Sequence, residues 1–283
     1  MVSEFLLGGD LPIRRMGFGA MRLPTASFGG PARDPRVGRD VLRRAVALGV
    51  NHIDTAAFYV SGDGRVRANA LIREALQPYP PDLVIATKVG PIRGPDGALR
   101  PGTAAELRAS IEVNLETLGL DRLDLVYLRI GMMGVPHGTS IAERFEALAR
   151  MREEGLIRHL GLSNVDVHHL AEASAIAPVA AVQNHFHSGM RDSVDVLDAC
   201  IAQGIGFAPF FPLGGGRTRL DDGRLARVAA RHGATVEQIA LAWLLALSPV
   251  TLAIPGTGDI THLEENVAAG AIALTPQDLA ALA

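Results

Sequence analysis

Residues 103–129 read TAAELRASIEVNLETLGLDRLDLVYLR, and this stretch joins the two patterns from which the fold is predicted. Apolar residues recur at helical spacing over 104–118, and Thr103 with Glu106 has the spacing of a capping box at the start of that helix. The run LDLVYLR (123–129) then has the alternation and the apolar content of a strand. A helix followed closely by a strand indicates one unit of an α/β fold.

The same alternation covers most of the chain. Strand-type runs are MGFGA (16–20), NHIDT (51–55), LVIATKV (83–89), LDLVYLR (123–129), IRHLGLSN (157–164), AAVQN (180–184), GIGFAPF (204–210) and TLAIPG (251–256). Helix-type runs cover 39–48, 65–76, 104–118, 141–154, 167–175, 194–202, 236–247 and 260–269. Eight such repeats predict one α/β domain over 1–283, a (β/α)8 TIM barrel. An open doubly wound sheet is the alternative, but no G-x-G-x-x-G follows the first strand.

Additional elements are expected around the eight units. The segment 5–15, centred on a Gly-Gly-Asp turn, predicts an N-terminal β-hairpin that caps the barrel bottom. An extra helix is expected over 221–230, and Thr275-Pro276 predicts the start of a short terminal helix. Two more capping boxes are predicted from Ser140 with Glu143 and from Thr235 with Gln238.

Composition narrows the class of function. With 27 basic and 30 acidic residues and a net charge of −3, the chain has no basic patch typical of nucleic-acid or membrane binding, so we expect a small-molecule substrate. A single cysteine, Cys200, favours a reducing compartment, and the start MVSEFLLGGDLP does not resemble a signal peptide. The expectation is a cytoplasmic monomer or weak homo-oligomer. Of the 27 basic residues only Lys88 is a lysine, which suggests a chemical role for its ammonium.

Several polar residues stand at the ends of predicted strands, where barrel enzymes carry their active sites. Asp54, Lys88 and Arg129 end three of these strands, and Tyr59 follows in the next loop. We expect Asp54 to pair with Lys88, and the ammonium to lower the pKa of the Tyr59 phenol so that it exchanges a proton near neutral pH. Arg129 is expected to act as a fixed cation. The alternative is that it turns away to a structural carboxylate, Asp124 or Glu154.

The motifs NHIDTAAFY, ATKVG, GLSN, VQN and IPGT…EEN together resemble the aldo-keto reductases, and the resemblance covers nearly the whole chain. It implies a nicotinamide-dependent oxidoreductase on a (β/α)8 barrel. Asp54, Tyr59 and Lys88 match three of the family's four catalytic residues, and Arg129 occupies the position of the fourth, normally a histidine. LRIGMMG, PFFPLGG and HLEENVAA are similar to the pyridoxal reductases, which share this arginine. That similarity implies reduction of pyridoxal to pyridoxine with NADPH.

The resemblance also implies a set of cofactor-binding residues. Ser163, Asn164 and Gln183 would hold the nicotinamide carboxamide, and Phe186 would stack on its ring. Asp54 belongs to this set as well. Gly19 and Met21 would lie at the nicotinamide ribose, and the remaining positions would hold the pyrophosphate (Phe211, Leu213, Gly214) and the adenosine end (Gly256, Thr257, His262, Glu265, Asn266). The amides of the last predicted helix would be offered to a 2′-phosphate.

Other interpretations stay open. His185 and His187 have a spacing that metal ligands use, but without a third ligand in the sequence no metal site is predicted. Lys88 could form a Schiff base, which would make the protein a lyase. The barrel could instead be a non-catalytic nicotinamide sensor that binds NADPH but turns over aldehydes very slowly. Within the reductases, the substrate could be another small carbonyl or a secondary metabolite.

Overall fold

The structure, a computed structural model, describes residues 4–27, 29–94, 98–132, 134–216, 220 and 223–282. Its strands are β1 (Glu4–Leu7), β2 (Leu11–Arg14), β3 (Phe18–Gly19), β4 (His52–Asp54), β5 (Val84–Val89), β6 (Pro91–Arg93), β7 (Leu99–Pro101), β8 (Leu123–Arg129), β9 (Ile157–Ser163), β10 (Val179–Gln183) and β11 (Gly206–Phe207). Its α-helices are α1 (Pro35–Ala47), α2 (Ala68–Leu76), α3 (Ala104–Leu118), α4 (Ala142–Glu153), α5 (Val167–Ile176), α6 (Val194–Gln203), α7 (Arg224–His232), α8 (Val236–Leu247), α9 (Ile260–Ala268) and α10 (Pro276–Leu282). Short 3-10 turns cover Ala20–Arg22, Gly214–Gly216 and Ala269–Ala271.

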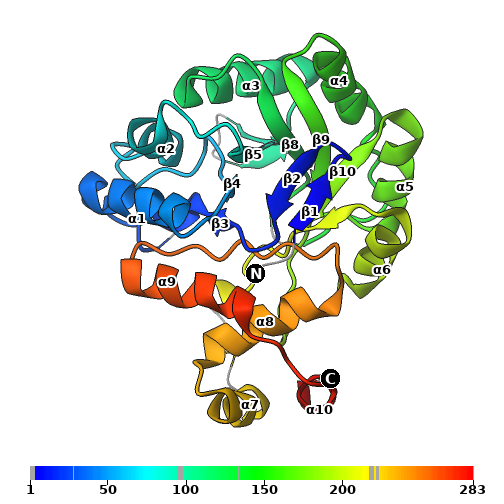
Figure 1. The fold of residues 1–283 in the computed structure, drawn as a ribbon. Helices are drawn as coiled ribbons and strands as arrows, with labels where there is room; N and C mark the ends of the chain where they lie inside the picture. Colours follow the sequence, from blue (N-terminus) through cyan, green and yellow to red (C-terminus); the bar gives the residue numbers. More distant parts are fainter. Residues whose placement is uncertain are drawn as a thin grey trace.

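The central sheet is parallel and curls into a barrel. Its seven strands run in the order β11, β10, β9, β8, β5, β4, β3, and helices surround them on the outside (Figure 1). The predicted (β/α)8 architecture is confirmed. Apolar side chains fill two regions, a large one between strands and helices and a smaller one inside the barrel. Because the strands are parallel, their carboxyl ends lie on one rim of the barrel, where the βα loops gather.

The eighth predicted strand closes the barrel without forming a regular ladder. Thr251 bridges to Phe207 on one side and Ala253 bridges to Met16 on the other, both in parallel. The Leu252 N–H donates to the Phe207 carbonyl at 2.7 Å. The first and seventh strands are also shorter than predicted, at two residues each. Prolines at 209 and 255 fall within the predicted runs, and their missing N–H groups limit the ladders.

The N-terminal hairpin closes the end of the barrel opposite the loops. β1 and β2 pair in antiparallel fashion and lie across the barrel (Figure 1). Leu7 and Ile13 are fully buried and belong to the apolar cluster inside the barrel. At the turn, Asp10 binds Arg158 and His159 of β9 at 2.7 and 2.6 Å. The predicted cap is confirmed.

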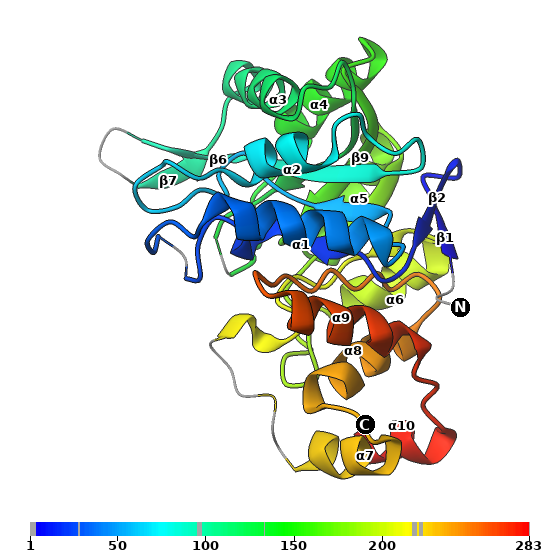
Figure 2. The same ribbon diagram turned by 60° about the vertical axis from the view of Figure 1, so that its left-hand side comes forward.

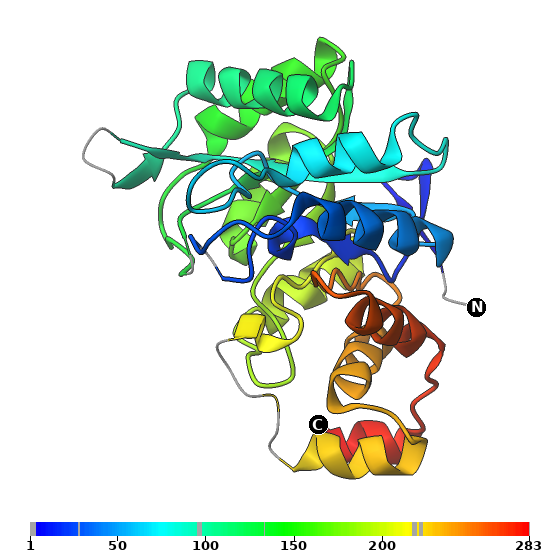
Figure 3. The ribbon, with the colours of Figure 1, turned by 90° about the vertical axis from the view of Figure 1, so that its left-hand side faces the viewer.

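Two further additions lie outside the barrel wall. The antiparallel hairpin of β6 and β7, which the sequence did not predict, projects from the side opposite to β1 and β2 (Figure 2). The predicted extra helix is α7, although positions 221 and 222 of the prediction lie outside the described residues. It packs with the predicted terminal helix α10 below the barrel (Figure 3). Asp278 joins them by accepting from Arg231 and His232.

Helix starts follow local capping. The boxes at Thr103 and Thr235 are present as predicted. The box predicted at Ser140 with Glu143 is wrong, because the Ser140 hydroxyl donates to Glu172 at 2.5 Å instead. α1 begins earlier than predicted, since Asp34 caps it and proline occupies its first position. These changes lie on the outer helices and leave the rim unaffected.

Candidate active site

A buried ion pair lies at the carboxyl ends of the adjacent strands β4 and β5. Lys88 Nζ donates to Asp54 Oδ1 at 2.6 Å and to the Thr55 carbonyl at 3.0 Å. Burial lowers the pKa of Lys88, but the Asp54 carboxylate and the nearby Tyr59 outweigh burial and raise it above its usual value. The predicted pairing is confirmed, and Lys88 carries its charge at neutral pH.

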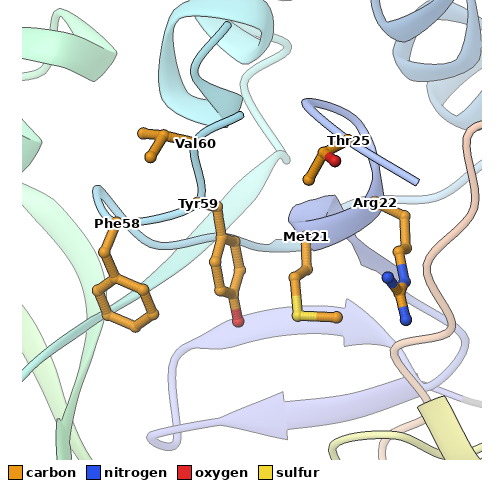
Figure 4. A pocket seen from close by; sticks show the side chains of 6 residues that line it. All are labelled: Met21, Arg22, Thr25, Phe58, Tyr59 and Val60. Carbon is orange, nitrogen blue, oxygen red and sulfur yellow. The ribbon is translucent and has the colours of Figure 1, made fainter. Parts of the chain in front are cut away.

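Tyr59 lies beside this pair, in the loop after β4. Its ring centroid is 4.9 Å from Lys88 Nζ, and Figure 4 shows its hydroxyl end between the side chains of Phe58 and Met21. Burial raises the pKa of the Tyr59 phenol, and the positive charges of Lys88 and Arg129 only partly offset this rise. The prediction of a net lowered pKa is therefore wrong, because burial outweighs the ammonium. At neutral pH Tyr59 is a protonated phenol, which is the form that donates a proton.

Arg129 ends β8 and reaches across the rim. Its Nη1 donates to Ser163 Oγ at 3.0 Å, and its other terminal nitrogen donates to the Met132 carbonyl. The guanidinium carbon lies 4.9 Å from the centre of the Phe210 ring. Burial lowers the pKa of Arg129 below its usual value, and the interactions with Tyr59 and Asp54 offset only part of this shift.

The alternative partners of Arg129 are engaged elsewhere. Asp124 accepts the Ile85 N–H at 2.9 Å, and Glu154 binds Arg108 at 2.5 Å. The alternative, in which Arg129 turns away to one of these carboxylates, is therefore wrong. Its side chain belongs to the rim beside Tyr59.

The amide and hydroxyl cluster follows on β9 and β10. Gln183 Nε2 donates to Asp54 Oδ2 at 2.7 Å, while Gln183 Oε1 has no hydrogen-bond partner among the described residues. Gln183 also interacts with the Tyr127 hydroxyl, which likewise has no well-formed hydrogen bond among the described residues. Asn164 Nδ2 donates to the carbonyls of Ile130 and Gly134. The amide of Asn164 thus holds the loop after β8, whereas Gln183 keeps an acceptor free.

An open cavity extends from Asp54 and Tyr59 along the rim to Gly258, in the loop before α9. Of the predicted cofactor residues, it is lined by Gly19, Met21, Asp54, Phe211, Leu213, Gly256 and Thr257. Gly214 is buried beside it. The lining residues that were not predicted include Arg22, Arg33 and Phe210. The length and the polar ends of this cavity suit an extended ligand such as a dinucleotide.

Phe186 does not reach this cavity. It is 2% exposed, and its ring stacks on Trp243 and meets Phe207 edge-on, within the apolar layer between strands and helices. The prediction that Phe186 stacks on a nicotinamide ring is therefore wrong. Phe210 lines the cavity together with the aromatic residues Tyr59 and Phe211, and His185 stacks on Phe210 at 5.3 Å.

The far end of the cavity also differs from expectation. Gly256 and Thr257 line it, but His262, Glu265 and Asn266 of α9 do not. The amide of His262 is already used, since it donates to Asp259 Oδ1 at 3.1 Å and so caps the helix. The predicted use of these helix amides by a 2′-phosphate is therefore opposed by the cap.

The parts of the chain that the structure describes contain neither a cluster of metal-ligating side chains nor a helix that could span a membrane. No cluster of three or more His, Cys, Asp and Glu side chains is present there. His187 Nδ1 instead accepts from the Gly189 N–H at 3.1 Å. None of the described helices has the length and apolar character needed to cross a membrane.

The sequence pattern that defines the aldo/keto reductase family matches residues 15–283. The chain belongs to this family. It is 47% identical over 286 residues to the pyridoxine 4-dehydrogenase of Escherichia coli (strain K12), a match that covers 100% of this chain and 98% of the relative. As an aldo/keto reductase, the protein is an oxidoreductase.

Solved structures agree with this placement. A thermostable aldo-keto reductase in complex with the inhibitor epalrestat superposes with a TM-score of 0.83 at 30% identity, covering 99% of this chain and 98% of that one. An aldo/keto reductase from Klebsiella pneumoniae in complex with NADP and acetate gives a TM-score of 0.80 at 26% identity, covering 100% and 94%.

Proposed function

We propose that the protein is an NADPH-dependent carbonyl reductase that converts an aldehyde to an alcohol. The observation that carries this proposal is the contact of Tyr59 with the buried pair of Lys88 and Asp54, because a protonated phenol beside a fixed cation is suited to general acid catalysis. Family membership and the 47% identity to a pyridoxine 4-dehydrogenase support the same reaction class.

The residues present fit a nicotinamide dinucleotide. Gln183 offers a buried acceptor without a partner in the described chain, which a carboxamide N–H could fill. Ser163 Oγ lies beside it on the neighbouring strand, and Phe210 provides an aromatic face in the cavity. When bound, the reduced cofactor would supply the hydride. Gly19, Met21, Phe211 and Leu213 would line its path along the rim, together with Gly256 and Thr257.

The chain's own residues then account for the proton. Tyr59 Oη would donate to the carbonyl oxygen of the substrate, leaving a phenolate. Lys88, which stays charged, would stabilise that phenolate through its positive charge. Asp54 would hold the ammonium in place by its hydrogen bond of 2.6 Å. Burial of Lys88 and Asp54 would exclude water from the pair and strengthen its effect on Tyr59.

The proposed substrate is pyridoxal or a similar aromatic aldehyde. Pyridoxal carries a phenolic oxygen on the ring carbon next to the one that bears its aldehyde, and this oxygen is largely ionised at neutral pH. Arg129 would hold this oxygen with its guanidinium, because a charge-assisted hydrogen bond both binds the anion and orients the carbonyl. The relative's name, pyridoxine 4-dehydrogenase, supports this choice.

A panel of carbonyl compounds tests the proposal by loss of NADPH absorbance. Pyridoxal should have a kcat/KM well above that of benzaldehyde and of simple aliphatic aldehydes. Equal values would remove the narrower claim and leave a general carbonyl reductase acting on another small or secondary-metabolite substrate. Tight NADPH binding without turnover of any carbonyl would indicate the nicotinamide sensor instead. Trapping of a substrate on Lys88 by borohydride would indicate the lyase.

The remaining organisation is also proposed. Residues 1–283 would form a single domain, since the hairpin and α10 pack against the same barrel. Cys200 is buried in α6, and this lone thiol supports a reducing, cytoplasmic setting. We propose a monomer or a weak homo-oligomer.

A further inference from the structure

The far end of the cavity lacks a cation where the last loop would be expected to provide one. Residues 256–262 read GTGDITH and contain neither lysine nor arginine. The one ionisable acid there, Asp259, caps α9 and so adds a negative charge. An anionic ligand at this end therefore needs a positive group from another part of the chain.

Arg33 reaches this end from the loop before α1. It lines the cavity, and its Nη1 donates to the Gly258 carbonyl through a long contact of 3.4 Å. Its Nε is buried and has no hydrogen-bond partner in the described part of the chain. The backbone of Arg33 is fixed, since its N–H donates to the Pro24 carbonyl at 2.9 Å. Arg33 thus presents donors from a held backbone, and among the described residues its guanidinium has the long contact with Gly258 and an electrostatic interaction with Asp259.

Nearby arginines have other partners. Arg22 lines the same cavity, but its guanidinium donates to the carbonyls of Ala26 and Gly215 at 2.7 and 2.6 Å. Arg44 binds Glu264 of α9 at 2.7 Å. Among the described residues that line the cavity, the positively charged ones are Arg22 and Arg33. Of these two, Arg33 is the one placed next to Gly258.

We propose that Arg33 recognises the 2′-phosphate of the adenosine ribose and thereby sets the preference for NADPH over NADH. This inference rests on the proposed function and names a residue that neither the last loop nor α9 supplies. Arginine suits the task because its planar guanidinium can donate two parallel hydrogen bonds to phosphate oxygens. A ribose 2′-hydroxyl offers no such charge, so the dinucleotide without the phosphate gains little from Arg33.

The test measures binding of two small probes, adenosine 2′,5′-bisphosphate and adenosine 5′-monophosphate, by calorimetry. Arg33→Met should weaken binding of the bisphosphate by roughly 10- to 100-fold, the loss expected for a charged hydrogen bond. Binding of the monophosphate should change by less than about twofold, since it lacks the 2′-phosphate. Arg33→Lys should retain part of the affinity through its charge.

Arg36→Met is the matched control, because Arg36 is exposed at the start of α1 and does not line the cavity. It should leave both affinities unchanged. Asp259→Asn should strengthen binding of the bisphosphate, because asparagine keeps the helix cap and removes the opposing charge. A thermal unfolding curve for each variant establishes that it is folded.

The outcomes separate this inference from the proposed function. Equal losses for the two probes would overturn it and place Arg33 at a group that they share, such as the 5′-phosphate. Unchanged affinities in a folded Arg33→Met protein would also overturn it. If the unmodified protein binds NADPH tightly in either case, the proposed function survives. Failure of the unmodified protein to bind NADPH or either probe would overturn both.

Discussion

The two ends of the barrel each hold an acid next to a cation, but in opposite surroundings. At the rim, Lys88 and Asp54 are 2% and 5% exposed. At the closed end, Asp10 is 49% exposed and binds Arg158 and His159 above an apolar plug. The hydrogen-bond distances are similar, 2.6 Å at the rim and 2.6 to 2.7 Å at the closed end. Distance alone therefore does not distinguish a reactive pair from a structural one.

Burial is what separates them. Removing two charges from water costs several kcal/mol per ion, so a buried pair adds little net stability. An exposed pair loses little hydration, but solvent screens its attraction. The closed end gains its stability from Leu7 and Ile13, which fill the barrel bottom. We infer that the rim pair is kept for its electrostatic effect on Tyr59, and that the Asp10 cluster positions the hairpin.

The largest expected effect is on catalysis at the rim. Tyr59→Phe removes the proton donor and should lower kcat by about 10²–10⁴-fold, with NADPH affinity nearly unchanged. Steady-state kinetics and fluorescence titration of NADPH measure the two quantities. Tyr79→Phe is the control, because Tyr79 donates to the Leu118 carbonyl far from the rim and its loss should not alter kcat. A Tyr59→Phe protein with normal kcat would contradict the assignment.

The second effect concerns stability and tests the contrast in burial directly. Lys88→Met leaves the Asp54 carboxylate buried without its cation and should lower the free energy of unfolding by about 3–5 kcal/mol. Urea denaturation measures the loss. The double variant with Asp54→Asn should recover much of it, since no charge is left unpaired. A loss below about 1 kcal/mol for the single variant would mean that the pair behaves like an exposed one.

Regular strands made most of the rim predictable. Along a strand, side chains alternate between the two faces, so Leu125, Tyr127 and Arg129 share the inner face of β8. The same rule corrects the error at Phe186. Gln183 faces the site, which places Phe186 on the opposite face with the helices. Ala208 lies in the inner cluster, so alternation would have selected Phe210.

Loop residues and net electrostatics were not accessible in the same way. Arg33 lies far in sequence from Gly258, and nothing in its local pattern indicates that the two meet. The Ser140 hydroxyl donates to Glu172 on the next helix, and a local capping rule does not consider such a distant partner. The sign of the Tyr59 pKa shift depended on how deeply the phenol is buried. Each of these depends on tertiary packing, which strand and helix periods do not encode.

A smaller effect is expected for substrate recognition. Arg129→Met should raise KM and lower kcat/KM for pyridoxal by roughly 10- to 100-fold, the loss expected of a charged hydrogen bond. Benzaldehyde, which lacks the ionised ring oxygen, should be affected much less. Kinetics on both substrates with one enzyme preparation make the comparison. Equal losses would mean that Arg129 acts through Tyr59 or supports the rim, and that it does not bind the substrate.

The smallest effect belongs to the closed end and depends on pH. A hydrogen bond from Arg158 lowers the pKa of Asp10 below its usual 3.8, assisted by His159 and opposed by burial. Because the folded state binds this proton more weakly than the unfolded state, the stabilisation is fully present above pH 3.8 and is lost as the pH falls through the lower folded-state pKa. Asp10→Asn should therefore lower the free energy of unfolding by at most about 1 kcal/mol at pH 7. The difference from the unmodified protein should shrink below pH 3.8, while kcat at pH 7 stays the same. Urea denaturation at several pH values measures this difference, and a loss at pH 7 as large as that of Lys88→Met would remove the distinction between the two ends of the barrel.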